Sequence, residues 1–269
     1  MSSSLPVTRS VDVEGTRVRV RTAGQGRPLL LVMGIGASLE LWGPFAETMA
    51  ERGHHVIAFD LPGAGASPAT VPPRRMPALA RIAVGVLDLL GIERADVLGV
   101  SFGGFVAQEI GRLTPDRVRR LVLAATAPGI GGVPGRVSAI VHLTTPWRYW
   151  SPAYTTRFAA SLYGGRARRD PGLGTTMPMR FERPPSWYGY ATQLYAVWGW
   201  TSLPWLHRLR MPVLVLSGDD DPIVRVLNGR ILAHLIPDAR LVVPAGAGHL
   251  FLIDEPTDAA GIVDGFLSE

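Results

Sequence analysis

Buried strands and amphipathic helices alternate along the first half of this chain, and this alternation limits the fold more than any other feature. The apolar runs are continuous, which is typical of strands covered on both faces in a parallel sheet. The predicted strands occupy residues 27–34, 54–60, 95–100 and 118–127, and the predicted helices occupy 38–52, 75–90 and 102–113. A hairpin at 11–24, turning at Glu14-Gly15, precedes them. We therefore expect an α/β fold with a mostly parallel sheet and helices on both of its faces.

The alternation stops after residue 127 and resumes near residue 206. It continues there as strand, helix, strand and helix, predicted at 211–218, 224–236, 239–246 and 256–267. The intervening segment is rich in Pro and Gly, and it holds every tyrosine and all but one of the tryptophans. A long segment of this kind in a compact domain is usually a lid or a binding element. We therefore expect a core of residues 1–127 and 206–269 with an aromatic-rich cap at 128–205.

The composition excludes several classes of protein. With 269 residues and no cysteine, the chain can bury a large core but cannot use a disulfide, a thiolate metal site or a cysteine nucleophile. No apolar run is long enough to span a membrane, and the first ten residues lack the apolar centre of a secretory signal. We therefore expect a cytoplasmic protein.

The net charge of the chain is +5, and all of its basic residues are arginines. Two clusters, RVRR at 117–120 and RARR at 166–169, suit an anionic surface, although pairing with carboxylates is the more ordinary explanation. Aromatic residues do not alternate with the arginines, as a groove for single-stranded nucleic acid requires. We expect no nucleic-acid partner.

The most informative short motif is GVSFG at 99–103, which has the form G-x-S-x-G. It follows a predicted strand and opens a predicted helix, so a sharp turn would hold Ser101 in a strained conformation with its hydroxyl exposed. The flanking glycines allow strand and helix to approach each other closely. A glycine-rich turn with a bystander serine gives the same string, so the motif depends on its context.

A nucleophilic serine needs a base and an acid that orients the base. Three aspartates follow a predicted strand in GDDDPIV (218–224), and His249 lies in the glycine-rich loop after the last strand. The other histidines do not follow a strand in this way. The chain order Ser101, Asp221, His249 is the order expected for the nucleophile, acid and base of an α/β-hydrolase.

Ester hydrolysis also needs two backbone N–H donors for the oxyanion. One is expected at Phe102, directly after the serine. The second is expected at Ile35, in the loop after strand 27–34, where Gly34 and Gly36 let the backbone turn inward.

With these residues, the chain resembles the α/β-hydrolase family over nearly its whole length. Within that family it is most similar to the intracellular poly(3-hydroxyalkanoate) depolymerases that act on medium-chain polyesters. The resemblance implies Ser101 as nucleophile, His249 as base and Asp221, the third residue after Gly218, as acid. It rests on VMGIGASLELWGPF (32–45), GVSFGGFVAQ (99–108), RLVLAATAPG (120–129), YGGRARRDP (163–171), WGWTSLPWLHRL (198–209), GDDDPIV (218–224) and GHLFLIDEP (248–256). Met33, Ala64 and Phe102 depart from the residues common in the family.

The resemblance implies hydrolysis of medium-chain polyhydroxyalkanoate through an acyl-enzyme, at a granule surface and without a metal or organic cofactor. The residues also leave open a carboxylesterase or lactonase acting on small soluble apolar esters, and an inactive scaffold that serves as a binding protein. Apolar side chains of the cap are expected to contact an uncharged acyl chain. The candidates for substrate contact are Met33, Trp147, Trp150, Trp187, Tyr188, Trp198 and Trp200.

Overall fold

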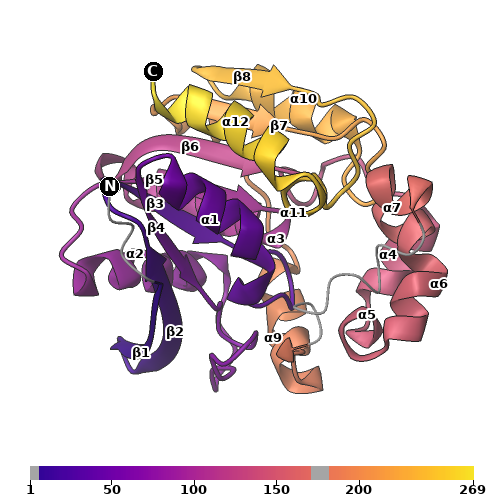
Figure 1. The fold of residues 1–269 in the computed structure, drawn as a ribbon, viewed down its shortest axis with the longest axis horizontal. Coiled ribbons are helices and arrows are strands. Elements are labelled where there is room, and N and C mark those ends of the chain that lie inside the picture. Colours follow the sequence, from indigo (N-terminus) through magenta and orange to yellow (C-terminus); the bar gives the residue numbers. More distant parts are fainter. Residues whose placement is uncertain (1–5, 171–181) are drawn as a thin grey trace.

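One mostly parallel sheet forms the centre of the molecule (Figure 1). A computed structural model describes residues 6–170 and 182–269, and within them eight strands pair in the order β1-β2-β4-β3-β5-β6-β7-β8. β1 and β2 form an antiparallel hairpin, β2 pairs antiparallel with β4, and the remaining pairs are parallel. The strands are β1 (Val7–Val13), β2 (Thr16–Ala23), β3 (Arg27–Val32), β4 (His54–Phe59), β5 (Ala95–Val100), β6 (Val118–Ala124), β7 (Val213–Leu216) and β8 (Ala239–Val242). The predicted fold class is confirmed.

Parts of three sequence-based expectations lie outside the described residues. These are the start of the N-terminal segment (1–5), a part of the expected cap (171–181), and Pro171 of the YGGRARRDP motif. The hairpin turns at Glu14 and Gly15, both of which have positive φ, as the sequence predicts. Its first strand begins at Val7 because β1 pairs along most of β2.

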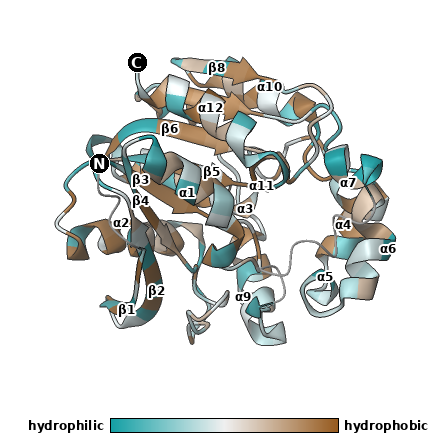
Figure 2. Cartoon of the chain, viewed as in Figure 1, coloured by the Kyte–Doolittle hydropathy of each residue, from teal (hydrophilic) through white to brown (hydrophobic). Residues whose placement is uncertain are grey.

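Helices cover both faces of the sheet. α1 (Gly43–Glu51), α11 (Phe251–Asp254) and α12 (Pro256–Leu267) pack on one face. α2 (Met76–Leu89), α3 (Phe102–Leu113) and α10 (Val226–Leu235) pack on the other. The central strands β3, β5 and β7 are strongly apolar, while β1, β2 and the helices also carry polar residues (Figure 2). Among the described residues, no helix has the length and apolar composition needed to cross a bilayer.

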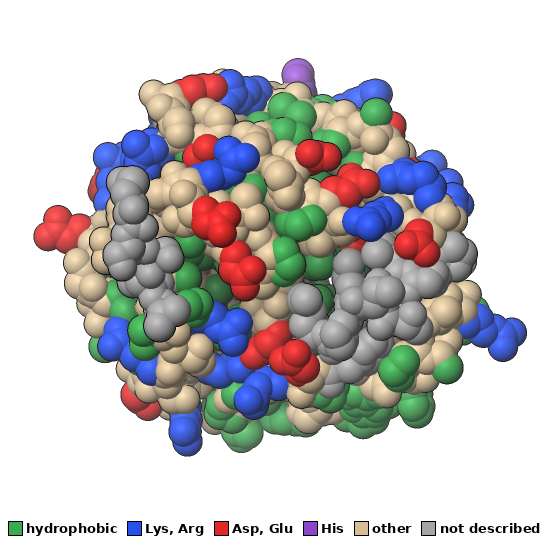
Figure 3. Space-filling model, viewed as in Figure 1, with side chains coloured by type: hydrophobic (Ala, Val, Ile, Leu, Met, Phe, Trp, Pro, Cys, Tyr) green, Lys and Arg blue, Asp and Glu red, His purple; other side chains and the backbone are tan. Residues whose placement is uncertain are grey.

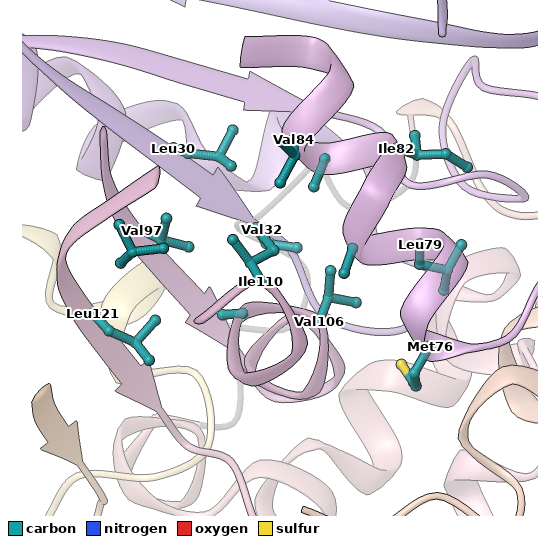
Figure 4. Packing of buried hydrophobic residues seen from close by; sticks show 14 of the residues in the cluster. Leu30, Val32, Met76, Leu79, Ile82, Val84, Val97, Val106, Ile110 and Leu121 are labelled. Atoms are coloured by element: carbon teal, nitrogen blue, oxygen red, sulfur yellow. The ribbon is translucent and has the colours of Figure 1, made fainter. Parts of the chain in front are cut away.

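The second face shows how sequence periodicity becomes packing (Figure 4). Val106 and Ile110 of α3 are one helical turn apart and lie in the same buried cluster as Val32 and Val97 of the sheet. All four side chains are fully buried. Burying an aliphatic side chain of this size contributes about 1.5–3 kcal/mol relative to leaving it exposed, so this layer fixes α3 firmly on the sheet.

The predicted helix at 38–52 is divided in the structure. A 3₁₀ helix, η1 (Leu39–Trp42), precedes α1, and Pro44 occupies the first turn of α1. Proline lacks the N–H that a continuous helix would need at this point, so the chain starts a new helix there. The short helix α11 was not predicted, since four residues are too few to show helical periodicity.

A buried ion network holds the loops next to these elements. Both Nη atoms of Arg19 on β2 donate to the Glu40 carboxylate at 2.6 and 2.7 Å, and Arg19 Nε donates to Asp60 at 2.6 Å. Asp60 also accepts the backbone N–H groups of Leu39 and Ala66, each at 2.8 Å. Burial alone would raise the pKa of Glu40, but hydrogen bonds from Arg19 and Ser38 outweigh it and lower that pKa to about 2.

Between β6 and β7 the chain leaves the sheet and forms a group of helices beyond the carboxyl ends of the strands (Figure 1). Serine caps begin two of them: Ser151 Oγ accepts the N–H of Tyr154, and Ser186 Oγ accepts the N–H of Gly189. Their described members are α4 (Val137–Leu143), α5 (Trp147–Trp150), α6 (Pro152–Tyr163), α7 (Gly165–Arg169) and α9 (Trp187–Val197).

Candidate active site

Ser101 lies at the junction of β5 and α3 in a strained backbone conformation. Its φ of 54° and ψ of −119° are rare for a residue with a side chain. The Ser101 N–H donates to the carbonyl of Ala124 at 2.9 Å, and its carbonyl accepts the Thr126 hydroxyl at 2.8 Å. Backbone strain of this kind persists only where neighbouring contacts enforce it, and it is typical of functional sites.

The two glycines of the motif make this turn possible. A methyl group on Gly103 would lie 2.0 Å from the carbonyl oxygen of Val32, and one on Gly99 would lie 2.3 Å from the carbonyl oxygen of Gly103. Backbone atoms cannot move aside as a flexible side chain can. The glycines are therefore required for α3 to pack this closely on β5 and β3.

His249 and Asp221 come together from the loops after β8 and β7. His249 Nδ1 lies 2.8 Å from Asp221 Oδ2, and both side chains are buried. The other carboxylate oxygen of Asp221 accepts the backbone N–H groups of Ile223 and Val224 at 2.8 and 2.9 Å. Because a carboxylate can only accept, Nδ1 donates the hydrogen bond, so in the neutral imidazole Nε2 is the nitrogen with a free lone pair that can act as a base.

The neighbouring aspartates have other surroundings. Asp220 accepts the N–H of Gly165 at 2.7 Å and forms two hydrogen bonds of 3.0 Å with Arg168. These interactions hold the pKa of Asp220 below its usual value, although burial opposes the shift. Asp219 is exposed. Of the three aspartates in the GDDDPIV motif, Asp221 is the one bonded to His249.

Ser101 and His249 line the same cavity at the carboxyl edge of the sheet. In the described part of the chain, no direct hydrogen bond joins their side chains. Such bonds are often long in a free enzyme and shorten when substrate is bound. The cavity is mostly apolar, and its remaining lining residues are Met33, Gly34, Ile35, Ala37, Leu41, Val100, Leu143, Arg148, Tyr149, Tyr163, Ile223, Leu250 and Ile253.

The loop expected to supply an oxyanion donor lies against the serine. A methyl group on Gly34 would lie 3.9 Å from Ser101 Oγ. Ile35 lines the cavity, and Phe102 is the first residue of α3, so its N–H has no acceptor within the helix. Helices of the 128–205 segment hold this loop: Tyr149 Oη donates to the Ile35 carbonyl at 2.7 Å, and the Gly36 N–H donates to Gln193 Oε1 at 2.7 Å.

The tryptophans expected to contact substrate occupy other places. Trp147, Trp150 and Trp187 pack edge to face with ring centroids 5.0–6.2 Å apart, outside the lining of the cavity. Trp147 and Trp187 are each about half exposed, at 47% and 48%. Tyr188 and Trp198 are exposed too, at 48% and 74%. The three packed tryptophans form an aromatic patch at α5 and the start of α9, while Trp198 follows the other end of α9.

Trp200 corrects the expectation that it faces the cleft. It is buried in the core, where its ring lies 4.9 Å from that of Phe105 and its Nε1–H donates to Glu109 at 2.8 Å. The Glu109 carboxylate on α3 supplies the acceptor that a buried indole needs. Met33 is therefore the member of the predicted substrate-contact set that lines the cavity.

Sequence reasoning missed the polar lining of the cavity. The cavity is bordered by Arg148, Tyr149 and Tyr163. The first two stand within WRYW, where the sequence predicts only the tryptophans as substrate contacts. The four residues of α5 make a single helical turn, in which Trp147 is exposed, Trp150 is partly buried, and Arg148 and Tyr149 are buried. The signal available in the sequence was a charged residue, Arg148, standing among the aromatic residues of WRYW.

The 166–169 arginine cluster fastens the inserted helices to the candidate site. Arg168 pairs with Asp220, Arg166 donates to a backbone carbonyl of α11, and Arg169 donates to one in the His249 loop. The 117–120 cluster pairs with carboxylates on α2 and β5. The more ordinary explanation, pairing with carboxylates, therefore holds for both clusters.

The glycines of YGGRARRDP serve the same attachment. A methyl group on Gly164 would lie 1.9 Å from the Asp220 carbonyl oxygen, and one on Gly165 would lie 2.2 Å from the backbone nitrogen of Gly248. The N–H of His249 donates to the Tyr163 carbonyl at 2.7 Å. The turn between α6 and α7 thus lies directly on the loops of Asp221 and His249.

This arrangement, a serine at a strand-to-helix turn with a histidine and an aspartate from two later loops, occurs in a known class of enzymes. A family model described as alpha/beta hydrolase fold matches residues 27–191 and 178–256, and the chain belongs to that family. A poly(3-hydroxyalkanoate) depolymerase of Ectopseudomonas oleovorans is 42% identical over 97% of this chain and 92% of its own.

More distant relatives share the whole length of the chain. A 2-hydroxymuconate semialdehyde hydrolase of a Pseudomonas species (strain CF600) is 30% identical over 99% of this chain and 96% of its own. The crystal structure of an enol-lactonase from Burkholderia xenovorans LB400 superposes with a TM-score of 0.83, covers 97% of this chain and all of its own, and is 25% identical.

Proposed function

We propose that this chain is a serine hydrolase that cleaves the ester bonds of medium-chain poly(3-hydroxyalkanoates). The observation that carries the proposal is the buried His249–Asp221 pair beside a strained Ser101 in one apolar cavity. The high identity to a named depolymerase over nearly the full length supports the substrate class.

The residues divide the chemistry between them. His249 Nε2 takes the proton of Ser101 as the hydroxyl attacks the ester carbonyl, and Asp221 stabilises the imidazolium that forms. The N–H groups of Ile35 and Phe102 bind the developing oxyanion. The alcohol leaves with the proton from His249, and water then attacks the acyl-enzyme by the same route in reverse. A hydroxyl group and an acid end group are the products.

Residues 128–205 act in this proposal as a cap that completes the cavity. Leu143, Tyr149 and Tyr163 of this segment line it together with residues of the core. Gly164 and Arg168 fix the segment to the acid loop. The substrate therefore enters between the cap and the carboxyl edge of the sheet.

The aromatic patch of α5 and α9 suits a water-insoluble substrate, and we propose that it adsorbs to the polyester granule in the cytoplasm. In Figure 3, hydrophobic side chains gather along the lower edge of the molecule, over the position of α9 in Figure 1. Exposed patches of large apolar residues mark interaction surfaces, and aromatic rings contribute much contact area. Trp147 and Trp187 of the patch, and the exposed Trp198 that follows α9, are the most informative residues for a test.

The decisive assay compares an emulsified C8 polyester with p-nitrophenyl octanoate. The proposal predicts acid release from the polymer and hydrolysis of the soluble ester, with both lost in Ser101→Ala. A fluorophosphonate probe should label the wild type and not this variant. Octanoate hydrolysis without any release from the polymer would remove the depolymerase assignment and leave an esterase.

Adsorption has its own test. Replacing Trp147, Trp187 and Trp198 by serine should weaken sedimentation with polyester granules while activity on p-nitrophenyl octanoate persists. Leu89→Ser on α2 is the matched control, because Leu89 is 52% exposed and lies outside the patch. Equal loss of sedimentation in both proteins would mean that the patch has no special role.

The second candidate is a lactonase or carboxylesterase of small soluble esters. The likeness to the enol-lactonase structure and the position of the cavity beneath cap residues favour it. A higher kcat/KM for p-nitrophenyl acetate than for the octanoate ester, with an inert polymer, would support this candidate.

A further inference from the structure

The structure contains a buried positive charge that the proposed ester chemistry does not use. Arg148 on α5 is 2% exposed, and its side chain borders the same cavity as Ser101 and His249. The guanidinium lies over the rings of Tyr149 and Tyr190, 4.6 and 5.2 Å from their centroids. An arginine keeps its charge at any pH a protein tolerates.

The polar contacts that Arg148 makes with the described residues are all with neutral groups. Nη1 donates to Tyr190 Oη at 2.7 Å and, more weakly, to the carbonyls of His142 at 3.4 Å and Thr145 at 3.3 Å. Nη2 donates to the Ile35 carbonyl at 3.4 Å. Within residues 6–170 and 182–269, no carboxylate forms an ion pair with Arg148. Removing an ion from water costs several kcal/mol unless an opposite charge compensates it.

Arg19, the other buried arginine among the described residues, is compensated differently. Arg19, for comparison, forms two short ion pairs with Glu40 and Asp60. The single long contact of Arg148 Nη2, at 3.4 Å, and the position of Arg148 on the cavity wall leave room for a stronger acceptor. A substrate carboxylate would supply both the missing charge and the hydrogen bonds.

The charge is also close to the expected oxyanion donor. The carbonyl of Ile35 accepts from Arg148, while the N–H of the same residue is the proposed oxyanion donor. The contact site of Arg148 and the proposed oxyanion site therefore involve the two backbone polar groups of one residue, Ile35. A group bound at Arg148 must belong to a part of the substrate only a few bonds from the ester carbonyl under attack.

We propose that Arg148 binds the free carboxylate at the end of a 3-hydroxyalkanoate chain, so that the enzyme cleaves the last ester bond. This inference rests on the proposed function. In such a chain, only the ester oxygen, the substituted carbon and one methylene separate the last ester carbonyl from the terminal carboxylate. That short spacing matches the distance of a single residue between the two sites.

The bonds balance in each turnover. Ser101 Oγ attaches to the last ester carbonyl, and the released alcohol is a 3-hydroxy acid that carries away the carboxylate held by Arg148. Water then frees the remaining chain from Ser101. That chain now ends in a new carboxylate, which is the group that Arg148 recognises in the next cycle.

The test compares the linear dimer of 3-hydroxyoctanoate as free acid and as methyl ester. Charged hydrogen bonds of this kind predict a kcat/KM about tenfold to a hundredfold higher for the free acid with the wild type. In Arg148→Gln the ratio should fall toward one. Equal values for the two substrates with the wild type, or an unchanged preference in Arg148→Gln, would overturn the inference.

Arg157→Gln is the matched control, since Arg157 lies exposed on the neighbouring helix α6, and it should keep the preference of the wild type. If Arg148→Gln does not fold, inhibition of the wild type decides instead: 3-hydroxyoctanoate should inhibit at a lower concentration than its methyl ester. Labelling of Ser101 and hydrolysis of p-nitrophenyl octanoate report separately on the proposed function. If the wild type shows neither labelling nor octanoate hydrolysis, the proposed function is contradicted. If it shows both but has no preference for the free acid, only the role of Arg148 is contradicted.

Discussion

The hydroxyl of Tyr149 donates a 2.7 Å hydrogen bond to the carbonyl oxygen of Ile35. This bond joins an inserted helix to the loop beside Ser101, and a bond from the Gly36 N–H to Gln193 does the same from α9. A methyl group on Gly36 would meet the rings of Tyr149 and Tyr190 at 2.8–2.9 Å, so the contact is tight. Both bonds hold the Ile35–Gly36 peptide, which directly follows the peptide whose N–H is the proposed oxyanion donor. The orientation of this loop therefore depends on how the inserted segment is packed.

Tyr149→Phe tests this dependence. Loss of a direct oxyanion donor costs about 10²–10³-fold in kcat, so loss of a group that only orients the donor should lower kcat less, by about tenfold. KM should change little, because the phenyl ring keeps the apolar wall. Steady-state kinetics with p-nitrophenyl octanoate measure both constants.

Tyr188→Phe serves as the control for this substitution, since the Tyr188 hydroxyl makes a 3.4 Å contact with Thr70 on the surface. It should behave as the wild type. A Tyr149→Phe enzyme with a raised KM and an unchanged kcat would show that the tyrosine shapes the pocket and does not orient the loop.

Asparagine substitutions at Asp221 and Asp219 should have very different effects on esterase activity. In Asp221→Asn the amide oxygen can keep the N–H groups of Ile223 and Val224, which turns the NH2 group toward His249 Nδ1 and favours the wrong tautomer. The expected loss in kcat is about 10³–10⁴-fold. Asp219→Asn should be nearly silent because Asp219 is exposed. Esterase assays on the two purified variants measure this. A severe defect in Asp219→Asn with an active Asp221→Asn enzyme would assign the acid elsewhere.

Two helical glycines should respond in opposite directions to alanine. Gly103→Ala forces a methyl group against the Val32 carbonyl and should lower the free energy of unfolding by about 1–3 kcal/mol, with loss of activity. In Gly265→Ala on α12 the new methyl group has no atom within 4 Å, so the free energy of unfolding should rise by about 0.5–1 kcal/mol. Urea unfolding followed by circular dichroism gives both values. Similar changes in both variants would contradict the tight packing at Gly103.

Glu40 should make the fold sensitive to acid. Its pKa lies at about 2 in the folded chain, below the ordinary value of 4.5. A lowered carboxylate pKa stabilises the folded state above the unfolded pKa, and this contribution disappears as the pH falls through the folded pKa. The free energy of unfolding should therefore decrease between about pH 5 and pH 2.

The variant Glu40→Gln isolates this contribution. Its unfolding free energy, measured by urea titration at several pH values, should depend less on pH in that window than that of the wild type. Glu269→Gln is the control, because Glu269 forms an exposed pair with Arg240 and such pairs contribute little. If the unfolding free energies of the wild type and Glu40→Gln depend on pH in the same way, Glu40 does not contribute to the loss of stability in acid.

The sequence predicted the elements whose periodicity is long or continuous. The runs ending at Val32 and Val100 are apolar at successive positions because both faces of the sheet are covered. The GVSFG motif predicted the turn at Ser101 from a local pattern, although the glycine at 103 is required by the close approach of α3 to Val32 of β3. The division of the helix before α1 and the short helix α11 depended on single residues and short spans, which leave no periodic signal.

The aromatic residues show the limit of that reasoning. The sequence places Trp147, Tyr149 and Trp150 within one helical turn, yet the first is exposed on the surface and the second lines the cavity. Composition cannot separate them because all are large and aromatic. Which side of a short helix faces the core depends on the elements against which it packs.

The sequence by itself determined the sheet, its covering helices and the order of serine, aspartate and histidine, because these follow from local periodicity and turn chemistry. Tertiary structure alone decided that Arg148 is buried with no carboxylate partner among the described residues, and that Tyr149 holds the loop of Ile35. Those contacts join residues more than 100 positions apart, and long-range packing of this kind leaves no trace in the local pattern of either segment.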